Sequence, residues 1–133
     1  MLLIEAIKSL AEALDIAFVL TDGDLCPPGP RIILVNSAFE RMTGYTAAEV
    51  TGRSPRMLQG ERTSLASRVS IRQALRAGAP HTSTMVNYRK NGEAYHCEIQ
   101  LFPIHDPSGQ MINVVAMERE VPVRPGRKAR PTK

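Results

Sequence analysis

The 133-residue chain has no long hydrophobic run. Its longest apolar stretches are IAFVL at 16–20 and IILV at 32–35, whereas a helix that crosses a bilayer needs about 20 residues. The amino-terminal segment also lacks the features of a signal peptide, because Glu5 interrupts it and neither a basic region nor a small-residue cleavage site flanks it. We therefore expect no membrane association and a cytoplasmic location.

Cysteine is scarce, and so are patterns of catalytic residues. Cys26 and Cys97 are the only cysteines, with no Cys-x-x-Cys spacing and no histidine in metal-ligand register, so we expect reduced thiols and no zinc site. The three histidines are scattered, with no acid or nucleophile at a catalytic spacing. The chain also lacks a phosphate-binding glycine loop and a kinase histidine motif. We therefore expect that it is not an enzyme.

The net positive charge belongs to the carboxyl end of the chain. Five basic residues follow Val121 with no acid among them: Arg124, Arg127, Lys128, Arg130 and Lys133. Subtracting these five from the net charge of +4 leaves −1 for the preceding residues. We interpret residues 121–133 as a solvated, disordered tail. No aromatic residues lie between its charges, so we do not expect a nucleic-acid partner.

The order of the predicted elements indicates an α+β domain, because the helices gather in one stretch beside an antiparallel sheet. The expected elements are an amphipathic helix at 2–14, strands at 17–21 and 31–36, two short helices within 37–52, a helix from a cap at Thr63 to about Ala77, and strands at 81–89, 94–104 and 111–120. We divide the chain into a helical cap at 1–15, a domain at 16–120 and the tail.

The first helix carries a hydrophobic stripe of Leu3, Ile7, Leu10 and Leu14. Two alternatives are open for it: packing on the sheet of the same chain, or pairing with a second copy.

Two arginines and two amides form a candidate binding constellation. Arg56 and Arg72 lie sixteen residues apart, and convergence of their guanidinium groups would make a phosphate clamp. Gln59 and Asn87 carry amides, which both donate and accept hydrogen bonds and so suit the edge of a heterocycle.

The turn KNGE predicts a hairpin between the two strands that follow the helices. With a three-residue loop and Gly92 in a bulge, we expect Asn87 opposite Cys97. With a two-residue loop, we expect Asn87 opposite His96.

Several motifs together resemble one family. FVLTD, NSAFERMTGY, GRSPRMLQG, NYRKNG and the closing strand, spread over residues 17–120, resemble the LOV subgroup of PAS domains, which bind flavin mononucleotide (FMN) and sense blue light. The resemblance implies a five-stranded antiparallel sheet with short helices on one face, and it implies a homodimer. It also implies that Arg56 and Arg72 hold the flavin phosphate and that Gln59 and Asn87 contact its polar part. The residues implied to line the ring pocket are Val19, Thr21, Ile99, Leu101, Val114 and Ala116.

Three positions depart from the family pattern. Pro55 stands where the family has its photoactive cysteine, Cys97 replaces a second flavin-binding asparagine, and Glu118 replaces a glutamine that reports the state of the flavin. We expect Cys97 at the pyrimidine edge of the ring.

Proline has no sulfur nucleophile, so the cysteinyl-flavin adduct cannot form at position 55. Ser54 followed by Pro55 is nevertheless a favourable helix start, with a cap and then a proline in the first turn. We expect FMN to bind non-covalently, more weakly than is usual in the family, and to respond to blue light or redox state through photoreduction. The alternative is a flavin-free PAS module for dimerisation or small-ligand sensing.

Overall fold

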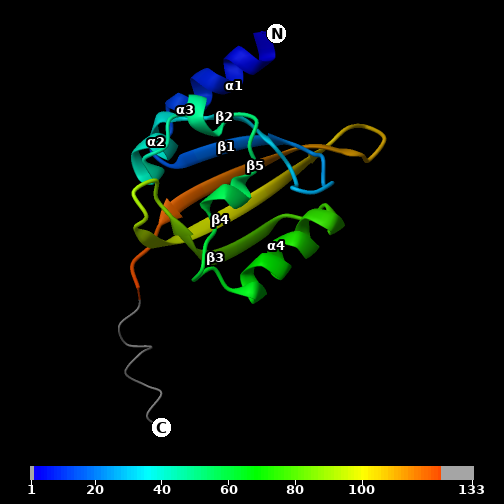
Figure 1. Ribbon diagram of the computed structural model, residues 1–133. Coiled ribbons are helices and arrows are strands. Elements are labelled where there is room, and N and C mark those ends of the chain that lie inside the picture. Colours follow the sequence, from blue (N-terminus) through cyan, green and yellow to red (C-terminus); the bar gives the residue numbers. More distant parts are fainter. Residues whose placement is uncertain (1, 124–133) are drawn as a thin grey trace.

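The protein, in a computed structural model that describes residues 2–123, is built on one five-stranded antiparallel sheet with helices packed against it (Figure 1). The strand order is β2-β1-β5-β4-β3, so β5 is the central strand. In chain order the elements are α1 (Leu2–Glu12), β1 (Ala17–Asp22), β2 (Ile32–Val35), α2 (Ser37–Thr43), α3 (Ala47–Val50), the 3-10 helix η1 (Pro55–Leu58), α4 (Leu65–Ala77), β3 (His81–Tyr88), β4 (Ala94–His105) and β5 (Met111–Glu120). This arrangement confirms the predicted α+β fold. Most of the predicted tail lies outside the described residues.

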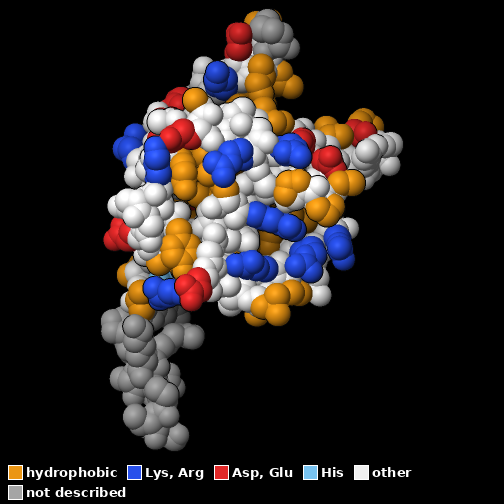
Figure 2. Space-filling model, viewed as in Figure 1, with side chains coloured by type: hydrophobic (Ala, Val, Ile, Leu, Met, Phe, Trp, Pro, Cys, Tyr) orange, Lys and Arg blue, Asp and Glu red, His pale blue; other side chains and the backbone are white. Residues whose placement is uncertain are grey.

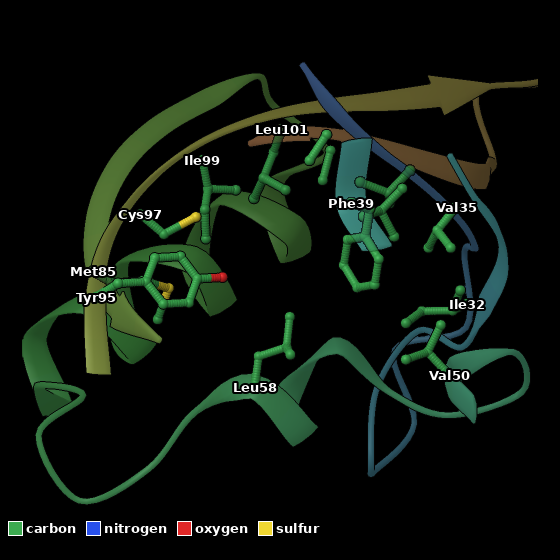
Figure 3. Packing of buried hydrophobic residues seen from close by; sticks show 14 residues of the cluster. Ile32, Val35, Phe39, Val50, Leu58, Met85, Tyr95, Cys97, Ile99 and Leu101 are labelled. Carbon is green, nitrogen blue, oxygen red and sulfur yellow. The ribbon is translucent and has the colours of Figure 1, made fainter. Parts of the chain in front are cut away.

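Alternation along the strands sends side chains to two separate cores. On β1, Val19 belongs to the larger core, whereas Phe18 and Leu20 belong to a smaller one. The larger core lies between the sheet and the segment from α2 to α4, and Figure 3 shows it from close by. The smaller core lies on the other face of the sheet, under α1. Successive strand residues point to opposite faces, so a single strand supplies both cores.

Helix α1 packs on its own sheet, but through a different stripe from the predicted one. Ile7 and Leu14 contact the smaller core as expected, whereas Leu3 and Leu10 are 72% and 70% exposed. Ile4 and the buried Ala11 complete the packed face, and they lie at the same three- and four-residue spacing. The predicted stripe was therefore wrong at two of its four positions.

The hairpin between β3 and β4 differs from both predicted registers. Asn87 lies opposite Tyr95, and Cys97 lies opposite Met85. The loop has three residues, because the amide of Arg89 donates to the carbonyl of Glu93 at 2.9 Å. Gly92 has a φ of 93°, as this loop requires. The three-residue loop was one of the two alternatives, but both predicted pairings of Asn87 were wrong. Because Arg89 pairs with Glu93, Asn87 lies opposite Tyr95, which is two residues nearer the turn than Cys97 and one nearer than His96.

Short capped helices fill the segment between β2 and β3. The two helices expected within residues 37–52 are confirmed as α2 and α3. The side chain of Ser54 accepts a hydrogen bond from the amide of Arg56, and Pro55 occupies the first position of η1. The expected Ser-Pro helix start is therefore confirmed.

The cap of α4 is Ser64 rather than the predicted Thr63. The Thr63 hydroxyl donates to the carbonyl of Val86 at 2.6 Å and accepts from the amide of Gly60 at 3.0 Å. Because these bonds tie Thr63 to β3 and to the preceding turn, the adjacent serine caps the helix, and its oxygen accepts from the amide of Ser67 at 3.0 Å.

No helix in the described part of the chain has the length and hydrophobicity needed to cross a membrane.

Candidate functional site

A cavity of about 450 Å³ lies between the sheet and the layer formed by η1 and α4. Ligand pockets in proteins usually have volumes of about 300–1,000 Å³. Figure 3 shows Leu58 of η1 facing Ile99 and Leu101 of β4 across the interior. The β1–β2 connection also contributes to the lining, through Leu25, Pro27, Gly29 and Pro30. The cavity therefore has a floor of strands, a wall of helices and a loop at its edge.

Inward-facing strand residues make the floor mainly apolar. Ile99 and Leu101 come from β4, and Val114 and Ala116 come from the central strand β5. They are adjacent because Leu101 pairs with Ala116 and Pro103 pairs with Val114. Thr21, at the end of β1, pairs with Val114 and adds one hydroxyl. This surface suits a flat apolar ring.

Four arginines line the cavity on its helical side. Arg56 comes from η1, and Arg68, Arg72 and Arg76 come from α4. Figure 2 shows basic side chains gathered around a hollow on this face of the molecule. The predicted pair of Arg56 and Arg72 thus borders a single cavity. An anion at this edge would meet guanidinium groups from two elements.

Two amides border the same cavity, Gln59 just after η1 and Asn87 on β3. Asn87 is 3% exposed, yet its side-chain oxygen has no hydrogen-bond partner among the described residues. A buried acceptor without a donor costs about 1–3 kcal/mol. The oxygen of Asn87 can therefore accept a hydrogen bond from an N–H group of a ligand in the cavity.

A carboxyl group lies on the floor of the cavity. Glu118 of β5 is 4% exposed, and within residues 2–123 its carboxyl has one hydrogen-bond partner, the thiol of Cys97, whose sulfur lies 3.7 Å from Oε1. Burial raises the pKa of Glu118 to about 7, because the charged form loses its hydration. Burial and the neighbouring Glu118 also raise the pKa of the Cys97 thiol far above its usual range. The thiol is therefore neutral at neutral pH, and the carboxyl of Glu118 keeps its proton to a higher pH than an exposed glutamate does.

Pro55 lines the cavity where the resemblance places the photoactive cysteine, and neither described cysteine replaces it there. Cys97 is fully buried behind the lining, and Cys26 is exposed in the β1–β2 connection. Among the described residues, no thiol borders the cavity.

The structure brings together most of the predicted site. Ten of the twelve predicted binding residues line the cavity, together with Pro55. Cys97 and Val19 do not line it: Val19 packs in the larger core, and the Cys97 sulfur faces Glu118. The expected place of Cys97 at the pyrimidine edge of a bound ring stays a prediction, although Cys97 is not part of the cavity lining.

Sequence reasoning missed several lining residues of α4: Arg68, Ile71, Leu75 and Arg76. Together with Arg72 they recur at three- and four-residue spacing, which is the signal for one face of a helix. That face was available in the sequence, but only Arg72 was selected from it.

Comparisons with known proteins agree with this geometry. Residues 15–121 match the family described as the PAS domain. A blue-light-activated histidine kinase of Brucella ovis is 36% identical over 94 residues, and phototropin-2 of Oryza sativa subsp. japonica is 34% identical over 119 residues. These matches cover 71% and 88% of this chain, but only 19% and 13% of the relatives. The chain thus spans less than a fifth of the length of these curated relatives.

Solved structures extend the likeness to the whole fold. The LOV domain of a blue-light-activated histidine kinase from Erythrobacter litoralis superposes with a TM-score of 0.76 at 29% identity, covering 83% of this chain and 99% of that one. An RNA-binding light-oxygen-voltage receptor gives a TM-score of 0.80 at 32% identity, covering 90% of this chain and 33% of that one. With the five-stranded sheet and the lined cavity, these matches place the chain in the PAS domain family, within its LOV subgroup.

Proposed function

We propose that this domain binds FMN non-covalently in the cavity and senses blue light or redox state without forming a cysteinyl-flavin adduct. The observation that carries the proposal is a cavity that keeps the family's arginines and amides while Pro55 lines it at the cysteine position. The relatives that support light sensing are a blue-light-activated histidine kinase and a phototropin.

The lining residues fit each part of FMN. Arg56 and Arg72 would hold the phosphate through charge-assisted hydrogen bonds, each contributing about 1.5–3 kcal/mol. The unpartnered oxygen of Asn87 would accept from an N–H group of the ring, and Gln59 would serve another polar edge. The floor residues of β4 and β5 would pack against the ring face. When bound, FMN supplies absorption of blue light and one-electron redox chemistry.

Two residues weaken the site relative to the family pattern. Cys97 cannot make the hydrogen bonds of an asparagine, and each lost bond costs about 1 kcal/mol, or roughly five- to tenfold in affinity. Glu118 donates a hydrogen bond only while it is protonated. We therefore expect FMN affinity to be lower than in family members that have both amides, and highest at acidic to neutral pH.

Reconstitution tests the binding. The full chain is refolded with excess FMN, passed over a desalting column and examined by visible absorption. We expect a yellow protein whose bound flavin loses its blue absorption band under blue light only when a thiol or tertiary-amine reductant is present. A protein that stays colourless at every pH from 5 to 8 would contradict the proposal and favour the flavin-free module.

The Pro55→Cys variant tests the chemistry at this position. We expect it to lose the blue absorption band reversibly under light without any added reductant, because a thiol then borders the ring. Ser54→Cys is the matched control, since it places a thiol one residue away on the same cavity wall. Equal responses in the unaltered protein and in Pro55→Cys would contradict the assignment of position 55.

The exposed leucines of α1 support a homodimer. Leu2, Leu3 and Leu10 are each at least 70% exposed, although the opposite stripe of the helix is packed on the sheet. Pairing with a second copy would cover them. In this proposal the domain is a sensor that acts on an output region or partner and has no catalytic activity of its own.

A further inference from the structure

A short turn at residues 60–63 connects η1 to the cap of α4 and lies against the edge strand β3. Its first residue directly follows Gln59, one of the two amides that line the cavity. Two hydrogen bonds close the turn: the amide of Thr63 donates to the carbonyl of Gly60 at 3.0 Å, and the amide of Gly60 donates to the Thr63 hydroxyl at 3.0 Å. The position of this turn therefore sets where Gln59 leaves η1.

Two further hydrogen bonds tie the turn to β3, one on each side of Asn87. The Thr63 hydroxyl donates to the carbonyl of Val86 at 2.6 Å, and the amide of Arg62 donates to the hydroxyl of Tyr88 at 2.8 Å. Val86 and Tyr88 are the immediate neighbours of Asn87, the second amide of the cavity. Because successive strand residues point to opposite sides, Tyr88 reaches the turn while Asn87 faces the cavity. The turn is thus joined to both amide residues, to one by the chain and to the other through its neighbours.

A close contact fixes the turn against β3. A Cβ added at Gly60 would lie 2.4 Å from Cε1 and 2.7 Å from Cδ1 of the Tyr88 ring, so the two groups would overlap. Gly60 is not among the glycines with a positive φ, so this contact, and not the backbone conformation, requires glycine here. The Arg68 Nη2 donates to the carbonyl of Gly60 at 3.0 Å, which attaches α4 to the same turn.

We propose that Tyr88 and Thr63 are positioning residues for ligand recognition. Through the turn at 60–63 they hold Gln59 and Asn87 at the spacing that the polar edge of a flat heterocycle requires. This inference rests on the proposed function and deepens it, because both amides are assigned there to the flavin ring. Tyr88 and Thr63 lie outside the lining of the cavity, so they act through the two amides and not by touching the ligand.

Recognition of the ring can be separated from recognition of the phosphate. Riboflavin carries the flavin ring without the phosphate, and FMN carries both. The ratio of their affinities therefore measures the contribution of the clamp formed by Arg56 and Arg72. Loss of a positioning residue should weaken both flavins by the same factor and leave this ratio unchanged.

Titration of the full chain with riboflavin and with FMN, followed by flavin fluorescence, compares Tyr88→Phe with the unaltered protein. The variant keeps the ring that contacts Gly60 and removes the hydroxyl that accepts from Arg62. We expect both flavins to bind about fivefold more weakly, as the loss of one hydrogen bond implies. Tyr45→Phe is the matched control, since it removes the hydroxyl of a half-buried tyrosine outside the cavity lining, and it should change neither affinity.

The infrared carbonyl bands of bound riboflavin distinguish positioning from a loss of stability. Amide groups that donate to a carbonyl lower its stretching frequency, so displaced amides should raise it. Well below the Tm, we expect the bands to move to higher frequency in Tyr88→Phe and to stay in place in Tyr45→Phe. A variant that only lowers the folded fraction would weaken the bands without moving them.

The contact between Gly60 and the Tyr88 ring gives a second test. Gly60→Ala should weaken riboflavin about tenfold when Tyr88 is present, because the ring or the turn must move. In Tyr88→Ala, where the ring is absent, the same substitution should weaken riboflavin at most about twofold. Equal effects of Gly60→Ala in the two backgrounds, or unmoved carbonyl bands in Tyr88→Phe, would overturn the positioning role.

Failure of the proposed function gives a different result. If neither flavin binds the unaltered protein, the side-chain amide NMR signals of Gln59 and Asn87 in the isotope-labelled, flavin-free chain replace the titration. Movement of these signals in Tyr88→Phe but not in Tyr45→Phe keeps the positioning role while rejecting flavin binding. Signals that stay in place in both variants would reject the positioning role as well.

Discussion

The buried carboxyl of Glu118 makes the stability of this domain depend on pH in a defined direction. Burial raises its pKa from 4.5 to about 7, so the folded protein holds a proton that the unfolded chain has already released. Between these two values the folded state binds more protons than the unfolded state, and stability therefore falls as pH rises. The difference of about 2.5 pH units corresponds to roughly 3 kcal/mol, fully present below pH 4.5 and lost above about pH 7.

Substitution by glutamine isolates this effect. Glu118→Gln keeps the size of the side chain and cannot ionise. The variant protein should therefore not lose this stability between pH 4.5 and about pH 7. We expect the difference in unfolding free energy between Glu118→Gln and the unaltered protein to grow by about 3 kcal/mol from pH 4.5 to pH 8. Urea unfolding of the flavin-free chain at half-unit pH steps measures it.

An exposed carboxyl provides the control. Glu61 lies on the surface before α4, so the unfolding free energy of Glu61→Gln should differ from that of the unaltered protein by the same amount at every pH. If the difference in unfolding free energy between Glu118→Gln and the unaltered protein is also constant with pH, within about 0.5 kcal/mol, the raised pKa of Glu118 is refuted. That result would mean that Glu118 ionises in the folded protein as readily as in the unfolded chain, and that water or a cation reaches it.

Three further predictions concern the scaffold and the assembly. Asn36→Ala should destabilise the fold by about 3 kcal/mol in urea unfolding, because the Asn36 amide makes four buried or partly buried hydrogen bonds to the backbone at 2.7–3.0 Å; a loss below 1 kcal/mol would contradict this role. Gly23→Ala should cost about 1–3 kcal/mol in the same assay, since its Cβ would lie 2.5 Å from the Met111 carbonyl oxygen; an unchanged midpoint would show that the strands shift freely. Leu3→Glu combined with Leu10→Glu should lower the light-scattering mass from dimer to monomer while the domain stays folded, and an unaltered protein that is already monomeric would reject the dimer.

Local sequence signals predicted the elements well, because the strands are bounded by turns and the short helices by caps. The Asn-Gly turn fixed the hairpin, and Ser54 with Pro55 fixed the start of η1. These features depend on contacts between residues close in sequence. They can therefore be inferred without knowing what lies across the domain.

Features that depend on distant contacts were predicted less well. Thr63 and Ser64 are equally suitable caps by local rules, and only the hydrogen bond to Val86 on β3 decides between them. In α1, two overlapping stripes satisfy helical spacing, and the packed one contains the small Ala11 in place of a leucine.

The candidate site shows the same division between local and distant information. Arg72 was selected through a motif, whereas its neighbours along the same helix face resembled ordinary solvated arginines until the cavity was located beside them.

Pro55 and Glu118 come from the two layers that enclose the cavity, and their chemistry is complementary. At the wall, a proline excludes covalent attack on a ligand. On the floor, a buried carboxyl whose pKa is raised to about 7 places an exchangeable proton where the resemblance places a neutral amide. A pocket with no nucleophile and one titratable acid is suited to a ligand that gains an electron and a proton together. The same dry surroundings that raise the pKa of Glu118 also stabilise a bound aromatic ring, so ligand occupancy and the protonation of Glu118 should be linked. A ligand that accepts a hydrogen bond from Glu118 should raise the pKa of Glu118 further. The affinity of that ligand should then fall as pH rises through about 7.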